Sequence, residues 1–452
     1  MVKILRPLLN RQGEPYADEF RLEDKTAVEQ IAWESGYYLQ QAKKISASSL
    51  MLGFFQMMQL GKNSLRTWAL KIGLLEGGTV RKSSLHDRLG PRAVGFVEGV
   101  LMRVMGERAK QARRAKRRLP GSEGLLQRFR EVLLCDSTCE KLPSNLASLF
   151  PSSYSHGEPA ATLRLQTVYN YTREAFVRFC VGSFRHNDQS ATDLILEVAR
   201  PGDLVLRDLG YFVLENLQKM ILQRIFFISK YRPATNLYDP QNGEEIDLLT
   251  LFKGKVKVDT IVLLGAKEKI PLRLVAQKLP EEVARQKKQN ARKDRNKKTN
   301  HSEAYYKLLE WVVFVTNVPP ELLNTNEIAE VYRVRWLIEI IFKAWKSHFN
   351  FSKTLNQKQM NYWRAIITIY LILIQIAYWS LDVYQYIKAG VEKLTDQPLS
   401  VLKYFDVLNA LKDLVINIAH LQELDPLIPQ FAVHATYEPR KKRQNFKERH
   451  IC

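Results

Sequence analysis

The feature that most restricts the fold is a long apolar segment at residues 365–381, with the sequence AIITIYLILIQIAYWSL. Such a segment must leave water, either inside a bilayer or inside the core of a globular protein. Its 17 residues reach only the lower limit for spanning a bilayer, it contains Gln375, and the sequence has no second segment of this kind. The segment therefore predicts a buried core helix in a protein without a membrane span.

The net charge indicates what kind of partner the protein binds. Sixty-eight Lys and Arg residues face 47 Asp and Glu residues, for a formal charge of +21, while the hydrophobic content of 46% is ordinary for a globular protein. This excess favours nucleic acid over an anionic membrane or a merely solvated basic surface. The four cysteines have no disulfide-framework spacing and only a poor zinc spacing, and the first residues do not resemble a signal peptide. We therefore expect a reduced, cytoplasmic protein.

Residues 1–120 are expected to form a helical N-terminal domain. A helix, a Gly77-Gly78 break and a short helix rich in Arg, Lys and Ser resemble a helix-turn-helix, although glycine turns between helices are common. The region ends in RAKQARRAKRRLPG, which is typical of a domain boundary and of a helix that contacts phosphates. The sequence leaves open whether the turn itself contacts DNA.

The rest of the chain alternates between strands and helices, which predicts an α/β fold. Residues 121–222 are predicted to hold three strands, a helix, a strand and a helix, and residues 223–320 to form a β-rich insertion. Strands of the insertion are expected at RIFFISKY, EIDLLTLF, KVDTIVLLG, PLRLVAQKL and EWVVFVTNV. Residues 321–390 return to helices, and residues 391–452 combine helices with a basic tail.

A strongly basic stretch, RQKKQNARKDRNKKTNH, lies between the last two predicted strands of the insertion. It holds eight Lys or Arg residues between positions 285 and 298, against the single acid Asp294. Alone, this pattern predicts a solvated loop; in a basic protein it is also typical of a loop that grips a nucleic-acid strand.

Two aspartates stand where apolar strands are predicted to end. Asp136 follows the run VLLC, and Asp208 follows the run LVLR, whereas Asp203 precedes its strand. In open α/β sheets, ligands bind at the carboxyl ends of the strands. Asp136 and Asp208 are therefore candidates for a shared site.

A third carboxylate, Glu339, lies in the periodic segment YRVRWLIEIIFKAWK, within a helix predicted for residues 326–350. At about 100° per residue, one polar stripe is expected to collect Tyr332, Arg335, Glu339, Lys343 and Lys346. Alone, the stripe is explained by i,i+4 ion pairs on an exposed helix. With the two aspartates, it predicts three carboxylates that hold two Mg²⁺ or Mn²⁺ ions, beside cations that grip phosphates.

The spacing of these residues resembles the Y-(2)-R-(3)-E-(6)-K signature of the DDE transposases of bacterial insertion sequences, in the IS-four family that includes the Tn-five transposase. Tyr332, Arg335, Glu339 and Lys346 match the signature at every spacing. The family's two aspartates have counterparts in the segments Asp136-Ser137-Thr138 and Asp208-Leu209-Gly210-Tyr211. The resemblance extends over roughly residues 126–390.

The resemblance implies an RNase H-like catalytic core with a β-rich insertion. Two Mg²⁺ (or Mn²⁺) ions would be bound there by three carboxylates, Asp136, Asp208 and Glu339. Phosphates near the cleaved DNA end would be contacted by Tyr332, Arg335 and Lys346.

The insertion is implied to add further DNA contacts. Trp311, 21 residues before Tyr332, would stack a base flipped out near the transposon end, although an ordinary core aromatic on a strand explains it equally well. Lys230 and Arg232 are weaker candidates, which a basic loop edge explains equally well.

The expected function is cut-and-paste DNA transposition. The N-terminal domain would bind the terminal inverted repeats of the element; the core would nick one strand, form a hairpin with the freed 3′ hydroxyl, and join the reopened ends to target DNA. Two transposon ends imply at least a homodimer, with the C-terminal helices as a candidate interface. Two alternatives are a catalytically silent, domesticated DNA-binding protein and an RNase H-like nuclease that only hydrolyses DNA.

Overall fold

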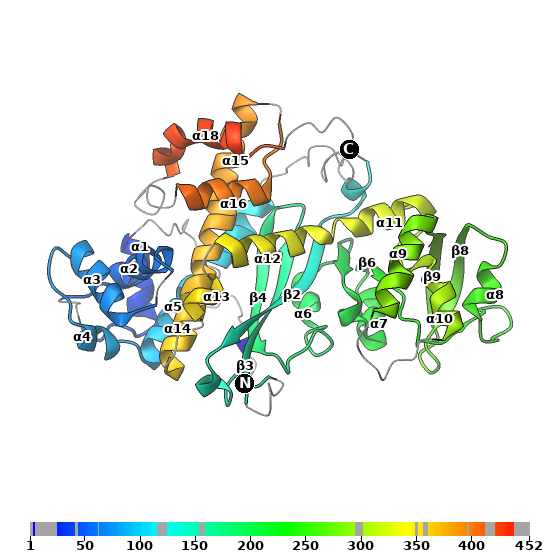
Figure 1. Cartoon of the computed structure of the whole chain (residues 1–452), viewed down its shortest axis with the longest axis horizontal. Coiled ribbons are helices and arrows are strands. Elements are labelled where there is room, and N and C mark those ends of the chain that lie inside the picture. The colour runs from blue at the N-terminus through cyan, green and yellow to red at the C-terminus, as the bar shows by residue number, and fades with distance from the viewer. Residues whose placement is uncertain are drawn as a thin grey trace. The chain divides into compact units, whose positions relative to one another are not determined.

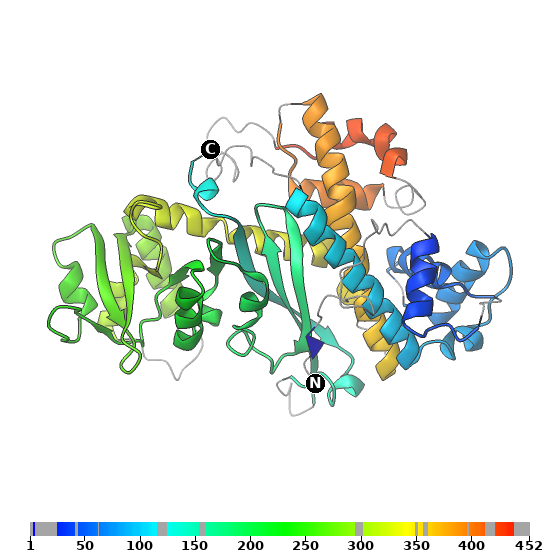
Figure 2. The ribbon, with the colours of Figure 1, turned by 180° about the vertical axis from the view of Figure 1, so that it is seen from behind.

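The computed structural model divides into two compact units (Figure 1, and from behind in Figure 2). The residues that the structure describes are 3–4, 25–40, 44–61, 63–114, 124–152, 159–293, 302–348, 351–355, 360–395, 397–411 and 421–437. Unit 1 contains Met1–Arg117, Asp136–Asn187 and Leu337–Asn445; unit 2 contains Arg118–Cys135, Asp188–Trp336 and Phe446–Cys452. The chain therefore passes between the units within strand β2 (Val132–Leu142) and at the start of helix α12 (Trp336–His348).

The N-terminal part of unit 1 is helical, as its sequence predicts. Its helices are α1 (Lys25–Glu34), α2 (Ala47–Gln59), α3 (Leu65–Leu75), α4 (Lys82–His86) and α5 (Pro91–Arg114). Between α3 and α4 the chain turns at Gly77, whose φ is +66°. At Gly73 a Cβ would stand 2.7 Å from the carbonyl oxygen of Gly78, so that position also requires glycine. Local geometry thus accounts for Gly73 and Gly77, whereas a Cβ at Gly78 would meet nothing within 4 Å.

Unit 1 also contains one part of the sheet, in the strand order β1-β4-β3-β2. Strands β3 (Ala161–Asn170) and β4 (Ala175–Ser183) pair antiparallel, and β1 (Lys3–Ile4) pairs with β4. Helix α12 packs against β4 through Trp345, whose ring centroid lies 4.8 Å from that of Phe176 and 6.3 Å from that of Phe179. This aromatic contact fixes α12 on the sheet of unit 1.

The apolar segment forms the central helix of unit 1. Helix α14 (Tyr362–Ala377) continues through a π-helical turn (Tyr378–Val383) into α15 (Tyr384–Leu394). The run from Tyr362 to Leu394 is long and apolar enough to cross a membrane, but 88% of its most apolar stretch is buried inside the protein. The prediction of a buried core helix is confirmed. The remaining helices of unit 1 are α13 (Phe351–Leu355), α16 (Val401–Ala410) and α18 (Ile428–His434), with 3₁₀ turns at Ser144–Leu146 and Leu421–Leu427.

Unit 2 carries the strand order β2-β5-β6-β10-β9-β8-β7. The first residues of β2 pair parallel with β5 (Leu204–Arg207), which pairs parallel with β6 (Phe226–Lys230). Antiparallel pairs then join β6 to β10 (Trp311–Thr316), β10 to β9 (Ile270–Lys278), β9 to β8 (Lys257–Leu264), and β8 to β7 (Leu237–Tyr238). Its helices are α6 (Leu194–Val198), α7 (Leu214–Leu222), α8 (Leu248–Phe252), α9 (Glu281–Arg292), α10 (Glu303–Leu308) and α11 (Thr325–Arg333), with 3₁₀ turns at Leu126–Arg128 and Leu209–Tyr211.

The predicted fold class is confirmed. An antiparallel pair, β3 and β4, precedes the parallel strands β5 and β6, and β2 belongs to both parts of the sheet. This is the α/β, RNase H-like arrangement that the sequence predicts, with the β8–β9–β10 strands as the β-rich insertion. The five regions expected from the sequence, and the boundaries between them, stay predictions.

Two predictions within the insertion are wrong. The segment EIDLLTLF forms helix α8 rather than a strand, because Asp247 caps it by accepting from the amides of Leu249 and Thr250. The first part of the basic stretch forms helix α9 rather than a loop. Pro280 precedes α9, Glu281 and Glu282 occupy its first turn, and Arg292 its last, which suits the helix dipole. Residues 294–301 lie outside the described residues, as does the basic tail.

Candidate active site

Asp136 lies inside a strand rather than at its end. Strand β2 continues to Leu142, so this part of the prediction is wrong; the polar residues after Asp136 still alternate between more and less buried positions, as a strand allows. Only the pairing with β5 stops here. Its parallel register runs from Val132 opposite Leu204 to Cys135 opposite Arg207. Asp136 and Asp208 are thus each the next residue after the last registered pair.

Hydrogen bonds within unit 1 hold the backbone of Asp136. The hydroxyl of Thr167 on β3 donates to the Asp136 carbonyl oxygen at 3.2 Å. The amide of Ser137 donates to Oδ1 of Asp136 at 2.8 Å, which orients the carboxylate. Asp136 is partly exposed.

Asp208 directly follows β5 in unit 2, as predicted, and begins the 3₁₀ turn Leu209–Tyr211. Its side chain is 44% exposed. Gly210 has a steric reason to be glycine, because a Cβ there would stand 2.6 Å from Oδ2 of Asp188. The Asp-Leu-Gly-Tyr motif therefore combines an accessible carboxylate with a turn that has no room for a side chain two residues later.

The signature segment is two helices, so the predicted single helix over residues 326–350 is wrong. Helix α11 ends at Arg333 and α12 begins at Trp336. At the junction, Val334 and Arg335 donate their amides to carbonyls three residues earlier, which is the tighter 3₁₀ pattern. Both side chains are buried there, at 1% and 3% exposure. The single polar stripe assumed a continuous helix, so it does not exist as predicted.

Tyr332 is buried and bonded to the strand that carries Asp208. Its hydroxyl donates to the carbonyl oxygen of Arg207 at 3.2 Å, and its ring centroid lies 5.0 Å from that of Phe314 on β10. Lys230, at the end of β6, places its Nζ 5.7 Å from the centre of the Tyr332 ring. Tyr332 thus ties helix α11 to the residue that precedes Asp208.

Arg335 lies beside Asp208. One guanidinium nitrogen is 3.8 Å from Oδ1 of Asp208, and the guanidinium carbon lies 5.9 Å from the Tyr332 ring centre and 5.5 Å from that of Trp336. Arg335 is 3% exposed. Unit 2 therefore brings three predicted site residues together: Asp208, Tyr332 and Arg335.

Glu339 and Lys346 lie on α12 in unit 1. Glu339 is partly exposed. The Nζ of Lys346 donates to the carbonyl oxygen of Cys139 at 3.0 Å and lies 3.2 Å from Oε1 of Glu140, both on β2. The sequence did not indicate Glu140, because its place on the same strand as Asp136 appears only once β2 is known to continue.

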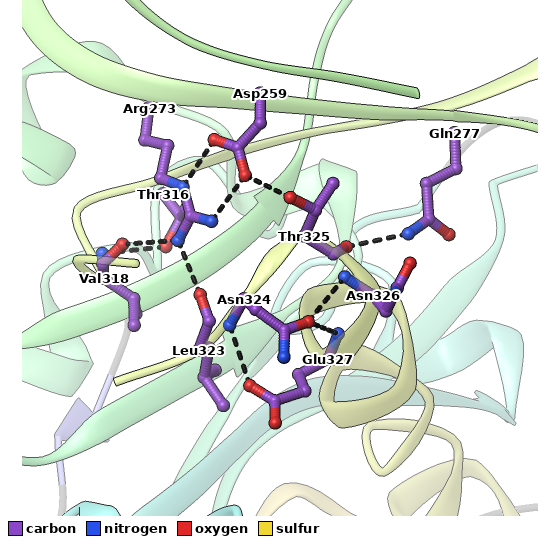
Figure 3. Close-up of polar contacts among 10 residues, drawn as sticks. All are labelled: Asp259, Arg273, Gln277, Thr316, Val318, Leu323, Asn324, Thr325, Asn326 and Glu327. Carbon is purple, nitrogen blue, oxygen red and sulfur yellow. Dashed lines mark hydrogen bonds and ion pairs between the residues drawn. The ribbon is translucent and has the colours of Figure 1, made fainter. Parts of the chain in front are cut away.

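A polar network in unit 2 fixes the start of helix α11 (Figure 3). Arg273 of β9 makes two hydrogen bonds to Asp259 of β8, at 2.7 and 2.6 Å, and also donates to the carbonyl oxygen of Leu323. Asp259 accepts from the hydroxyl of Thr325, the first residue of α11. A capping box between Asn324 and Glu327 completes the helix start. The hairpin of the insertion thus sets the position of the helix that carries Tyr332.

The charges of this network perturb the Asp259 carboxyl. Burial by itself raises the pKa of Asp259, but the hydrogen bonds from Arg273 and Thr325 and the charge of Arg273 outweigh it, so the pKa lies below its usual value. Asp259 is therefore an anchored anion rather than a proton donor at neutral pH.

Two further cations face this part of unit 2. Arg232 donates to the carbonyl oxygen of Leu209 at 3.3 Å, directly after Asp208. Burial and the nearby charge of Lys230 lower the pKa of Lys287, on helix α9, below its usual value. The sequence predicts one basic loop at 285–298, which does not distinguish Lys287 from its neighbours. A helix counted from Pro280 would have indicated which of these lysines share a face.

Trp311 is the first residue of β10 and is 8% exposed. Its ring stacks on that of Phe252, with centroids 4.4 Å apart and an interplanar angle of 25°. Phe252 covers one face of the ring, so a base could stack on Trp311 only at the other face or in place of Phe252. The base-stacking role stays a prediction.

The donor set fits hard divalent cations. Asp136, Asp208 and Glu339 offer carboxylate oxygens, which suit Mg²⁺ and Mn²⁺, and each side chain is at least partly exposed. Asp136 and Glu339 belong to unit 1, and Asp208 to unit 2. Within the residues that the structure describes, no three His, Cys, Asp or Glu side chains are gathered as a ready metal site. The ligand set stays a prediction.

The chain matches the family model of the transposase DDE domain over residues 127–374. The chain belongs to the DDE transposase family. The matched region contains both aspartates and all four residues of the signature. The enzyme class predicted from the sequence is thereby confirmed: this is a transposase, of a family that acts on DNA with divalent metal ions. Membership of the IS-four group stays a prediction.

Relatives of this transposase come from insertion sequences. The chain is 26% identical over 373 residues to the transposase for insertion sequence element IS231F of Bacillus thuringiensis subsp. israelensis, which covers 78% of this chain and 76% of the relative. It is 24% identical over 404 residues to the transposase for IS1151 of Clostridium perfringens, which covers 84% and 83%. A piggyBac transposase synaptic complex with hairpin DNA is similar in structure, with a TM-score of 0.44, 8% identity, and coverage of 96% of this chain and 89% of that one.

Proposed function

We propose that this transposase performs cut-and-paste transposition of a bacterial insertion sequence. The observation that carries the proposal is the Arg335 guanidinium 3.8 Å from the Asp208 carboxylate, because it joins the signature to the second aspartate within one unit. The reaction would begin with hydrolysis of one strand at the element's end, which leaves a 3′ hydroxyl. That hydroxyl would attack the opposite strand and form a hairpin, which is reopened and joined to target DNA.

In this proposal Asp136, Asp208 and Glu339 would hold two Mg²⁺ or Mn²⁺ ions. When bound, the ions would supply activation of the attacking oxygen and stabilisation of the leaving oxygen at a phosphodiester. The support is chemical: three carboxylate residues that are each at least partly exposed, two of which directly follow the last registered pair of parallel strands.

The cations of the site would hold the DNA backbone. Arg335 and Lys346 would contact phosphates near the cleaved end, and Tyr332 would contact a phosphate close to the active site. Three further cations of unit 2 would add phosphate contacts. Lys230 lies next to Tyr332, and Arg232 lies next to Leu209. Lys287 lies near Lys230. Positioning and charge stabilisation are the main contributions a protein makes to phosphoryl transfer.

The remaining parts of the proposal concern assembly. The helical N-terminal region would bind the terminal inverted repeats, and two protomers would pair the two element ends, with the helices after α14 as a candidate interface. The protein would act in the bacterial cytoplasm. Trp311 would receive a flipped base on the face opposite Phe252 or in place of Phe252.

The experiment is cleavage of a labelled duplex that carries the element's own end, with Mg²⁺, by the wild-type protein and by Glu339→Ala. Wild type is expected to form hairpins and joined products. Glu339→Ala is expected to bind the duplex with similar affinity and to cleave it at least about 1,000-fold more slowly, because a metal ligand is lost. Cleavage without joining would favour a hydrolytic nuclease, and binding without cleavage by wild type would favour a silent DNA-binding protein.

A further inference from the structure

Lys346, the last residue of the signature, is held by a carboxylate that the signature does not contain. Its Nζ lies 3.2 Å from Oε1 of Glu140 and donates to the Cys139 carbonyl oxygen at 3.0 Å. The other carboxylate oxygen of Glu140, Oε2, accepts from the hydroxyl of Ser352 at 2.7 Å. Glu140 is thus engaged by two helices of unit 1, α12 and α13.

The two members of this ion pair differ in exposure. The side chain of Glu140 is 7% exposed, whereas that of Lys346 is 41% exposed. A buried carboxylate retains its cationic partner strongly, because the unpaired charge is costly to bury. An ammonium has three donors, and two point at Glu140 and Cys139, so the exposed side of Lys346 can still meet a phosphate.

Glu140 also shares a strand face with Asp136. The two residues are four apart on β2, and residues at even spacing along a strand point to the same face. The strand that carries the first aspartate therefore also sets the location of the Lys346 ammonium. A change in Glu140 alters both the place of that ammonium and its effective charge.

We propose that Glu140 is a positioning residue that holds Lys346 for phosphate contact and competes with DNA for its charge. The inference rests on the proposed function, in which Lys346 contacts a phosphate. The proposal predicts that neutralising Glu140 has opposite effects on duplex affinity and on the cleavage rate. Neutralising Glu140 releases a cation, which strengthens binding to any duplex, and it removes the support of that cation, which slows cleavage.

The test is Glu140→Gln in the full-length protein. Affinity is measured for a random-sequence duplex of about 30 base pairs over a range of salt concentrations. We expect about three- to tenfold tighter binding, because the Lys346 charge is no longer partly neutralised by a carboxylate. The cleavage rate at saturating element-end duplex is expected to fall about 10- to 100-fold, because the cation is no longer placed. A residue with only a structural role would weaken both activities together.

A double-mutant cycle separates the pair from its surroundings. In a Lys346→Gln background, Glu140→Gln is expected to change affinity and cleavage by no more than about twofold, because its effects pass through Lys346. The matched control is Glu174→Gln, which removes a carboxylate 2.6 Å from the buried Lys388 elsewhere in unit 1. The control is expected to lower the midpoint of thermal unfolding but to leave duplex affinity and cleavage at the wild-type level.

A Glu140→Gln protein that binds and cleaves like wild type overturns the proposal. If that variant does not fold, Glu140→Asp keeps the charge and withdraws the carboxylate by one methylene; it is expected to cleave more slowly with unchanged affinity, and wild-type cleavage by it overturns the proposal. If the wild-type protein binds but never cleaves, the proposed function fails, and the affinity measurements alone still decide whether Glu140 competes for Lys346.

Discussion

The two units hold their halves of the signature in different ways. In unit 2, Arg335 is 3% exposed and lies against the rings of Tyr332 and Trp336. In unit 1, the Lys346 side chain is 41% exposed and is held by Glu140 and one carbonyl oxygen. Because it is buried beside two rings, the Arg335 guanidinium is held in one position. An exposed ammonium that is paired with a carboxylate still has a free side that can contact a phosphate.

This difference indicates a division of labour within one motif. Tyr332 bonds to the backbone just before Asp208, so the unit 2 half keeps the second aspartate in place. The unit 1 half presents an exposed cation whose charge is partly offset by the Glu140 carboxylate. The signature Y-(2)-R-(3)-E-(6)-K therefore combines buried residues of unit 2, which support Asp208, with an exposed cation of unit 1, which can contact DNA.

The largest effect is expected from exchanging the two cation types. Arg335→Lys should reduce cleavage about 100-fold, because a lysine cannot reproduce a planar group packed between Tyr332 and Trp336. Lys346→Arg should stay within about fivefold of wild type, because its exposed end has room for a larger cation. Single-turnover cleavage at saturating DNA measures both. Equal losses in the two variants would remove the proposed difference between the halves.

The next effect concerns the support of Asp208. Tyr332→Phe keeps the ring contact with Phe314 and removes the hydroxyl that donates to Arg207. A buried carbonyl oxygen then loses a donor, which costs about 1–2 kcal/mol. We expect about tenfold slower cleavage and little change in duplex affinity. If the hydroxyl instead contacts a phosphate, as the signature implies, the loss will fall mainly on affinity.

The sequence predicted the parts of the fold that depend on local apolar patterns. The run at 365–381 is a core helix, and LVLR is a strand directly followed by Asp208. Both runs could be predicted because nearly all of their residues are apolar and therefore indicate burial. The strand containing Asp136 was placed correctly but ended too early, because polar residues after position 136 hid its continuation to Leu142. Glu140 was missed for the same reason.

The candidate site could be predicted by residue type and spacing but not by exposure. The 3₁₀ junction at Val334 and Arg335 has no glycine or proline to announce it, and it follows from burial within unit 2. A helical projection therefore assigned Tyr332 and Arg335 to an exposed stripe. The α9 segment was predicted to be a loop because charge composition was weighed above the Pro-Glu-Glu start of a helix.

A smaller effect is expected at Lys287. Lys287→Gln should make the salt dependence of duplex binding less steep by about 0.9 in log-log slope, because one phosphate contact is lost. Lys288→Gln on the same helix is the matched control, since Lys288 is already paired with Glu310 at 2.6 Å. Binding isotherms at several salt concentrations give both slopes. Identical slopes in the two variants would mean that the Lys230–Lys287 pair faces no phosphate.

The smallest effect is a pH dependence of the stability of unit 2. The folded protein lowers the pKa of Asp259, so the Asp259–Arg273 pair stabilises the fold at pH values above the unfolded pKa of about 3.9 and loses this contribution as the pH falls through the folded pKa. Asp259→Asn should therefore unfold at a lower temperature than wild type at pH 7, with a gap that narrows below about pH 4.

Calorimetry of wild type and Asp259→Asn between neutral and acid pH measures the difference between their unfolding temperatures. Because Asp259 also accepts from Thr325 at the start of α11, the same substitution should loosen the helix that carries Tyr332. It should therefore slow cleavage slightly at neutral pH, through the unit 2 half alone. A gap that stays constant down to acid pH would mean that the Asp259 charge does not hold the helix start, and that the capping box of Asn324 and Glu327 fixes α11 without it.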